Sequence, residues 1–136
     1  MKTSQFAAVI LISSKGELVL QLRDDNPNIV DPGKLSLFAG RIEDDETPEV
    51  AASRELFEET TLKRMDLKFY KEFHKEAGRH GAKGTCYVYI LKGVDVRDVD
   101  VHEGQGYRLV SDLATLNETN TALISLDIIR DYLANN

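Results

Sequence analysis

Apolar and polar residues alternate along the first third of the chain in the manner of β-strands. Apolar stretches cover residues 6–12 and 17–23, and "SSKG" between them predicts a hairpin, because glycine adopts turn conformations at low cost. A polar, proline-containing loop follows, and "LSLFAG" predicts one further short strand. Polar residues 15–17 interrupt the N-terminal apolar stretch, so we expect a strand there and neither a signal peptide nor a membrane span.

The remainder of the chain contains two more strand patterns and ends in a helical one. "DLKFYKEFHKE" and "GTCYVYILKGV" predict strands joined by the basic loop "AGRHGAKG", and "GYRLVSDLATL" predicts another short strand. Residues 121–133 carry apolar side chains at a helical period, which predicts a closing amphipathic helix. Strands, a helix, more strands and a final helix indicate an α/β fold, with a mixed sheet flanked by helices, in one domain covering residues 1–136.

The helix predicted between the strand groups begins at Thr47 and Pro48. Threonine can cap the free amides of a helix, and proline is tolerated at the first helical position. At about 100° per residue, Val50 and Phe57 lie on one side, so we expect them to form the buried face. Three carboxylates share the opposite side: Glu55, Glu58 and Glu59.

Acidic residues are concentrated around this helix. The chain carries a net charge of −6, and residues 43–59 contain eight acids against the single base Arg54. Glu55 and Glu59 are like charges four residues apart near the helix C-terminus, where neighbouring anions and the helix dipole are both unfavourable. A solvated acidic face is one interpretation. The other is a site for a compensating cation, and Mg²⁺ is the best candidate because it prefers oxygen ligands.

Composition excludes several other classes of function. The chain has no basic stripe for nucleic acid, and its acidity disfavours binding to a phosphate backbone. The single cysteine, Cys86, cannot form an internal disulfide, which favours a reducing, cytoplasmic setting. A calcium loop at "DDNPNIVDPGKL" is discarded, because the glycine and glutamate of an EF-hand are absent from its sixth and twelfth positions.

The segment from residue 40 to residue 62 resembles the Nudix box of the MutT-like Nudix hydrolases. The matching positions are Gly40, Glu46, Arg54, Glu55, Leu56, Glu58, Glu59 and Leu62. Thr61 stands where the family has glycine, and Ala39 replaces the first of a glycine pair. A left-handed backbone at Thr61 would cost about 1 kcal/mol or more relative to glycine. The resemblance implies a Nudix-type α/β/α sandwich.

The resemblance also implies a reaction, namely hydrolysis of a nucleoside diphosphate linked to another moiety, as in nucleoside triphosphates and nucleotide sugars. The cofactor would be Mg²⁺, with Mn²⁺ as an alternative, and the partner a small nucleotide bound by a monomer or homodimer. The alternative is a Nudix-fold nucleotide sensor without turnover. In the enzyme, the basic loop residues Lys75, Arg79, His80 and Lys83 would meet terminal phosphates or a sugar, or would simply be solvated.

By this resemblance the catalytic residues are Arg54, Glu55, Glu58 and Glu103. The expected metal ligands are Gly40, Glu55, Glu58, Glu59 and Glu103. Gly40 would bring a backbone group close to the ion, and Arg54 would orient a carboxylate. Glu46 is expected to support Arg54 or its loop. Glu103, in "EGQG", would be an extra ligand or the general base, with a simple turn acid as the alternative. Arg23 would reach the substrate or lie on the surface.

Overall fold

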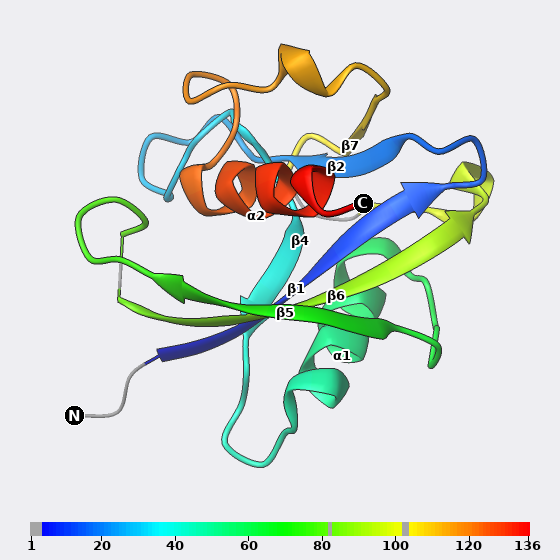
Figure 1. Ribbon diagram of the computed structural model, residues 1–136, viewed down its shortest axis with the longest axis horizontal. Helices are drawn as coiled ribbons and strands as arrows, with labels where there is room; N and C mark the ends of the chain where they lie inside the picture. Colours follow the sequence, from blue (N-terminus) through cyan, green and yellow to red (C-terminus); the bar gives the residue numbers. More distant parts are fainter. Residues whose placement is uncertain (1–3, 82, 102–103) are drawn as a thin grey trace.

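The computed structural model describes residues 4–81, 83–101 and 104–136, and a mixed seven-stranded sheet lies between two helices (Figure 1). The strands are β1 (Ser4–Ser13), β2 (Leu18–Leu22), β3 (Leu35–Ser36), β4 (Phe38–Arg41), β5 (Lys68–Lys75), β6 (Gly84–Val94) and β7 (Tyr107–Val110). The helices are α1 (Pro48–Thr60) and α2 (Leu123–Ala134), with short 3-10 turns at Val96–Asp98 and Leu113–Thr115. The expected fold class is confirmed. Within the described ranges, neither helix is long and apolar enough to cross a bilayer.

β1 organises the sheet because it pairs with three other strands. One flank of β1 pairs antiparallel with β2 near its C-terminal end and with β4 near its N-terminal end. The other flank pairs parallel with β6, which in turn pairs antiparallel with β5. The resulting order is β3-β2-β1-β6-β5, and β7 extends the sheet beside β2. This arrangement puts β4, and with it the segment leading into α1, at the N-terminal end of β1.

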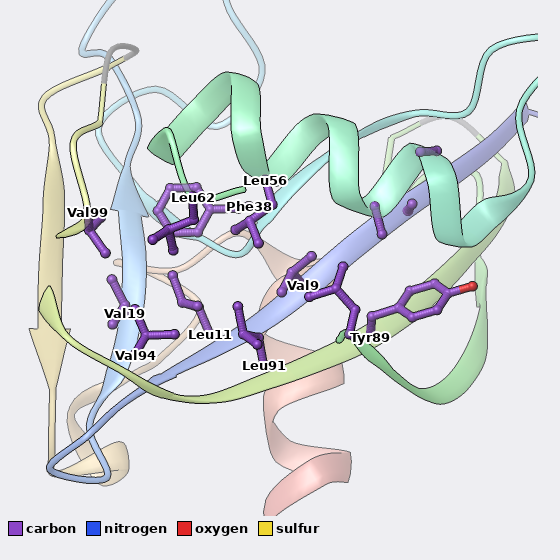
Figure 2. Close-up of a cluster of buried hydrophobic side chains, with 14 residues drawn as sticks. Val9, Leu11, Val19, Phe38, Leu56, Leu62, Tyr89, Leu91, Val94 and Val99 are labelled. Carbon is purple, nitrogen blue, oxygen red and sulfur yellow. The ribbon is translucent and has the colours of Figure 1, made fainter. Parts of the chain in front are cut away.

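Two hydrophobic cores form because successive residues of β1 point to opposite faces of the sheet. Ala7, Val9 and Leu11 pack in the cluster that includes Leu56 of α1 (Figure 2). Ala8 and Ile10 pack in the second cluster, which includes residues of α2. The near-continuous apolar run of β1 is therefore explained by burial on both faces.

The segment "LSLFAG" is not one strand, so that prediction is wrong. β3 pairs with β2 and β4 pairs with β1, and the chain changes partner at Leu37. The Leu37 amide donates to the Ser125 hydroxyl of α2 over 3.0 Å, so its donor is satisfied outside the strand ladder. The hydrophobic pattern could not reveal this break because Ser36, Leu37 and Phe38 are all buried, on both sides of the change of partner.

The expected buried face of α1 is also wrong. Val50 and Phe57 are 54% and 49% exposed, whereas Ala51, Ala52 and Leu56 are fully buried. The two alanines place little volume between helix and sheet, so the α1 backbone packs closely against β1 and β4. The side of α1 that packs against the sheet is therefore the one with the small side chains, and two larger apolar side chains remain in solvent.

Candidate active site

α1 begins and ends with the local geometry that its sequence favours. The Thr47 hydroxyl accepts a hydrogen bond from the Val50 amide over 3.2 Å, and Pro48 is the first helical residue. At the other end, Thr61 has φ 62° and ψ 1°, the left-handed conformation, and its amide donates to the Phe57 carbonyl over 2.8 Å. The residue that replaces the family's glycine therefore occupies a conformation that favours glycine.

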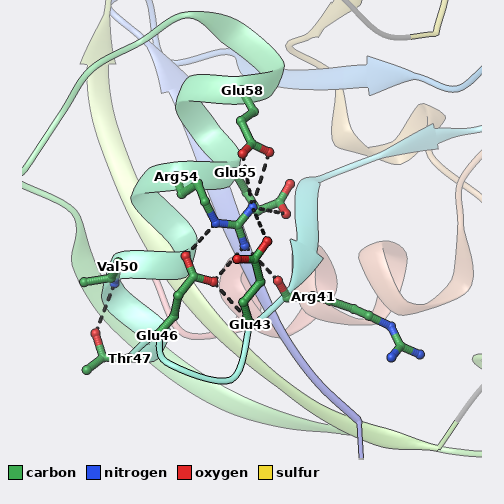
Figure 3. A network of polar contacts seen from close by, with 8 residues as sticks. All are labelled: Arg41, Glu43, Glu46, Thr47, Val50, Arg54, Glu55 and Glu58. Atoms are coloured by element: carbon green, nitrogen blue, oxygen red, sulfur yellow. Dashed lines mark hydrogen bonds and ion pairs between the residues drawn. The ribbon is translucent and has the colours of Figure 1, made fainter.

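Arg54 connects the carboxylates of this segment (Figure 3). Its Nε and Nη2 donate to the two carboxylate oxygens of Glu46 over 2.5 and 2.8 Å. Its Nη1 donates to Glu55 over 2.9 Å and to Glu58 over 3.2 Å. These bonds raise the pKa of Arg54, and the bond to Glu46 contributes most. One guanidinium therefore brings together carboxylates from the loop and from α1.

Glu46 anchors that guanidinium from the loop before α1. Its side chain is only 12% exposed, and it also accepts the Glu43 amide over 2.9 Å. The bond from Arg54 is the main cause that lowers the pKa of Glu46 below its ordinary value. Arg54 Nη2 also donates to the Arg41 carbonyl of β4 over 3.0 Å. The Arg54 side chain thus connects the loop, β4 and α1. Its bidentate bond to Glu46 both stabilises the guanidinium and fixes its orientation.

Gly40 leaves the space that Glu55 occupies. A Cβ atom added at Gly40 would collide with the Glu55 carboxylate, so any side chain here would displace that group. Ala39 meets no such demand, since it is exposed. Among the described non-glycine residues, only Asp31 and Thr61 have positive φ. Glycine is needed at position 40 because the Glu55 carboxylate approaches the backbone closely there, whereas Ala39 occupies an ordinary strand position.

The three glutamates of α1 differ in exposure. The Glu58 side chain is 54% exposed and that of Glu55 is 15% exposed, while Glu59 is buried with 5% of its surface accessible. Glu55 and Glu58 converge on Arg54, and Glu59 lies on the buried side of the helix. Within residues 4–81, 83–101 and 104–136, no three acidic, histidine or cysteine side chains already form a metal-binding group.

Glu103, a further predicted site residue, falls outside the described residues. Arg23 lies away from the network of Arg54. The Nε of Arg23 donates to the Val30 carbonyl over 2.8 Å, and Arg23 lines a cavity of about 200 Å³ together with Ile29 and Gly104. The Gln105 side-chain amide donates to the Arg23 carbonyl over 3.0 Å, so the segment after residue 103 contacts this arginine.

Part of the basic loop is bound to α2. Arg79 donates to both Asp127 oxygens over 2.9 and 3.0 Å, and His80 Nε2 lies 2.7 Å from the same carboxylate. His80 Nδ1 accepts the Glu76 amide, so its Nε2 carries the proton and donates to Asp127. Sequence reasoning did not single out Asp127. The feature of the sequence that could have indicated Asp127 is its spacing from Asp131, because the two acids lie four residues apart on one helix.

Cys86 lies in β6 and is only 3% exposed. Burial raises the pKa of its thiol to about 12. A thiol that stays protonated is neither a nucleophile nor a metal ligand at neutral pH.

Comparison with known proteins identifies the family. The NUDIX domain model matches residues 1–127. The MutT protein of Methanosarcina mazei Go1 is 23% identical, with a TM-score of 0.77 over 100% of this chain and 99% of its own. The Ap4A hydrolase of C. elegans is 17% identical, with a TM-score of 0.69 over 98% of each chain.

A longer protein shares the fold over part of its length. The bifunctional NMN adenylyltransferase/ADP-ribose pyrophosphatase of Francisella tularensis, whose structure contains AMP and a manganese ion, is 17% identical. Its TM-score is 0.74 over 98% of this chain and 42% of its own. At sequence identities this low, the structural neighbours show only that the fold is shared. The match to the NUDIX domain model shows that the chain belongs to the family. The chain belongs to the Nudix family and is a hydrolase of pyrophosphate bonds.

Proposed function

We propose that this protein hydrolyses a nucleoside diphosphate linked to another moiety, in a nucleoside triphosphate or nucleotide sugar, with Mg²⁺ as cofactor and Mn²⁺ as an alternative. The observation that carries the proposal is the arrangement around Arg54, where Glu46 holds the guanidinium and the guanidinium holds Glu55 and Glu58 beside Gly40. The names of the C. elegans and Francisella proteins, both hydrolases of nucleotide anhydrides, support this substrate class.

The residues of α1 fit a hard divalent ion. Carboxylate and carbonyl oxygens are the ligands that Mg²⁺ and Mn²⁺ prefer, and the space beside Gly40 is occupied by the Glu55 carboxylate. The residues that would hold the ion are Glu55, Glu58 and Glu59, with the Gly40 backbone. When bound, the ion would neutralise charge on the diphosphate oxygens and acidify a water molecule.

The other residues position these groups. Arg54 fixes the orientation of Glu55 and Glu58, and its bidentate bond to Glu46 restricts rotation of the guanidinium. Glu103 is proposed as a further ligand or the general base, on the strength of its motif alone. Arg23 is proposed to contact the substrate, because it lines a cavity whose wall also includes Gly104.

The proposed setting follows from the same features. We propose a cytoplasmic protein that binds a small nucleotide as a monomer or homodimer, with no nucleic-acid partner. The single buried cysteine and the net charge of −6 support this assignment.

A panel of nucleotides assayed with Mg²⁺ for phosphate, pyrophosphate and nucleoside monophosphate tests the proposal. We expect turnover of at least one compound, and a loss on the order of 10²-fold or more in Glu58→Gln, because a charged ligand is removed. Glu49→Gln is the matched control, since Glu49 lies in the first turn of α1 and is exposed. Equal activity of Glu58→Gln and wild type would contradict the assigned role of Glu58.

The sensor alternative is separated by binding. Isothermal titration calorimetry with the same panel measures affinity independently of turnover. Tight binding of one nucleotide without hydrolysis of any would overturn the enzyme proposal in favour of a sensor.

A further inference from the structure

Two cations share one aromatic ring beside the candidate active site. Lys75 Nζ lies 3.7 Å from the centroid of the Phe6 ring, and the guanidinium carbon of Arg41 lies 5.7 Å from it. The three residues come from β5, β1 and β4, so the cluster joins strands on both flanks of β1. A cation over an aromatic face is attracted by the negative face of the ring.

The sheet builds this cluster through its register. Phe6 and Arg41 are directly paired residues of β1 and β4. Lys75 pairs with Gly84 of β6, and Gly84 pairs with Ser4 of β1. A Cβ atom at Gly84 would lie 3.1 Å from the Phe6 ring and would collide with the Ser4 carbonyl. Because Gly84 has no side chain, the Lys75 chain can extend across β6 to the ring.

The two cations have no carboxylate partner in the part of the chain that the structure describes: no ion pair within 4.0 Å involves Arg41 or Lys75. Other basic residues in the same region are neutralised, since Lys71 pairs with Asp131 over 3.0 Å and Arg79 with Asp127 over 2.9 Å.

The environment of Lys75 is unfavourable to its charge. Burial is the main cause that lowers the pKa of Lys75, and the nearby Arg41 charge lowers it further. Cys86 and Asp31 act in the opposite direction, Cys86 more strongly than Arg41. Two like charges held together and partly desolvated are stabilised when an anion binds between them.

The cluster lies next to the network of Arg54. Arg41 directly follows Gly40, and its carbonyl accepts a bond from Arg54, while its side chain extends away from the carboxylates (Figure 3). Arg41 also lines a cavity of about 610 Å³, whose other lining residues are Ser4, Gln5, Ile42 and the acidic residues Glu43, Asp44 and Glu46. Consecutive residues of β4 therefore connect the two groups, since Gly40 lies against the Glu55 carboxylate and Arg41 lies beside the Phe6 ring.

We propose that Arg41 and Lys75 form an anion subsite that binds a phosphoryl group of the substrate outside the diphosphate that is cleaved. This inference rests on the proposed function, because it names a further group of the same substrate. Lys75 already occupies one face of the Phe6 ring, so that face is closed to a stacked base. The ring instead holds the ammonium group in place for an anion.

Binding of inorganic triphosphate to the metal-free protein tests the subsite without any need for turnover. In EDTA-containing buffer, an NMR titration should shift the backbone amides of Phe6, Arg41 and Gly84. Lys75→Gln should weaken binding by about tenfold, the loss expected for one charge-assisted contact. Lys68→Gln is the matched control, because it removes the same charge from an exposed position of the same strand, and it should change affinity less than about twofold. Equal weakening in both variants, or shifts confined to other basic residues, would overturn the subsite.

Kinetics separate this proposal from the proposed function. For substrates with a phosphoryl group beyond the cleaved diphosphate, Lys75→Gln should raise KM about tenfold, and for substrates without one it should leave KM unchanged. Triphosphate binding at Phe6 and Gly84 in a protein that hydrolyses nothing would contradict only the enzyme proposal. Turnover with the same KM in Lys75→Gln for both substrate groups would contradict only the subsite.

Discussion

Replacing Thr61 by glycine should stabilise the protein, although it deletes a side chain and a hydrogen bond. Thr61 is exposed, ends α1 and has φ 62°, where a β-branched side chain is crowded by its own backbone. Its hydroxyl contacts the neighbouring Thr60 carbonyl over 2.6 Å. Because Thr61 is exposed, its replacement leaves no cavity in the core, and the backbone conformation dominates the outcome.

The magnitude follows from two opposing terms. Relief of the left-handed strain is worth about 1–2 kcal/mol in the folded state. Glycine also gains conformational freedom in the unfolded chain, which costs about 0.5–1 kcal/mol of stability. The exposed hydroxyl contact contributes less than either term, since water replaces it. The net expectation for Thr61→Gly is a gain of about 0.5–1 kcal/mol, or roughly 2–4 °C in Tm for a chain of this size.

Urea denaturation of Thr61→Gly beside Thr61→Ala isolates the backbone contribution. Both variants lack the hydroxyl, but alanine keeps the Cβ atom that makes positive φ unfavourable, so Thr61→Gly should exceed Thr61→Ala by about 1 kcal/mol. Equal stability of the two variants would refute the reasoning, because it would mean that the helix end imposes no left-handed conformation.

Three further outcomes are expected. Glu46 has a lowered pKa in the folded protein, so its stabilising effect is present above its ordinary pKa of 4.5 and is lost as the pH falls below that value. In Glu46→Gln, the free energy of unfolding should therefore fall less between about pH 5 and pH 3 than it does in wild type. The same pH dependence in the variant and in wild type would contradict this. Gly40→Ala should keep the native circular dichroism spectrum but reduce kcat by on the order of 10²-fold, because its Cβ displaces the Glu55 carboxylate. Leu56→Ala should cost about 2–5 kcal/mol and Phe57→Gln less than about 0.5 kcal/mol in denaturation, whereas the reverse order would contradict the observed burial of α1.

The ends of α1 were predictable because they depend on local chemistry. A threonine followed by proline specifies a helix start without reference to the remaining chain, and Thr47 caps α1 as expected. The conformation of Thr61 follows from its place after the last helical residue, whatever the helix packs against. Fold class was predictable for a similar reason, since it depends on the order of strand and helix patterns.

The packed face of α1 was not predictable from its hydrophobic residues. Helical periodicity placed Val50 and Phe57 together, but burial depended on how closely the backbone could approach β1 and β4. Ala51 and Ala52 permit that approach, and a hydrophobicity pattern gives alanine little weight. The break at Leu37 has a similar origin, because the hydrogen-bond acceptor of its amide is Ser125, far away in the sequence.

The charge balance around Arg54 bears on the proposed cofactor. Like charges at Glu55 and Glu58 would be unfavourable on an isolated helix, and the guanidinium between them offsets part of that repulsion. Arg54 also bonds Glu46 and lies 3.9 Å from a Glu43 oxygen, so one positive charge meets four carboxylates and leaves an excess of three negative charges. A network that served stability alone would be close to neutral, because uncompensated charge in a partly desolvated site is costly. The remaining negative charge is what the proposed divalent cation would offset, so the arginine orients the carboxylates without neutralising them.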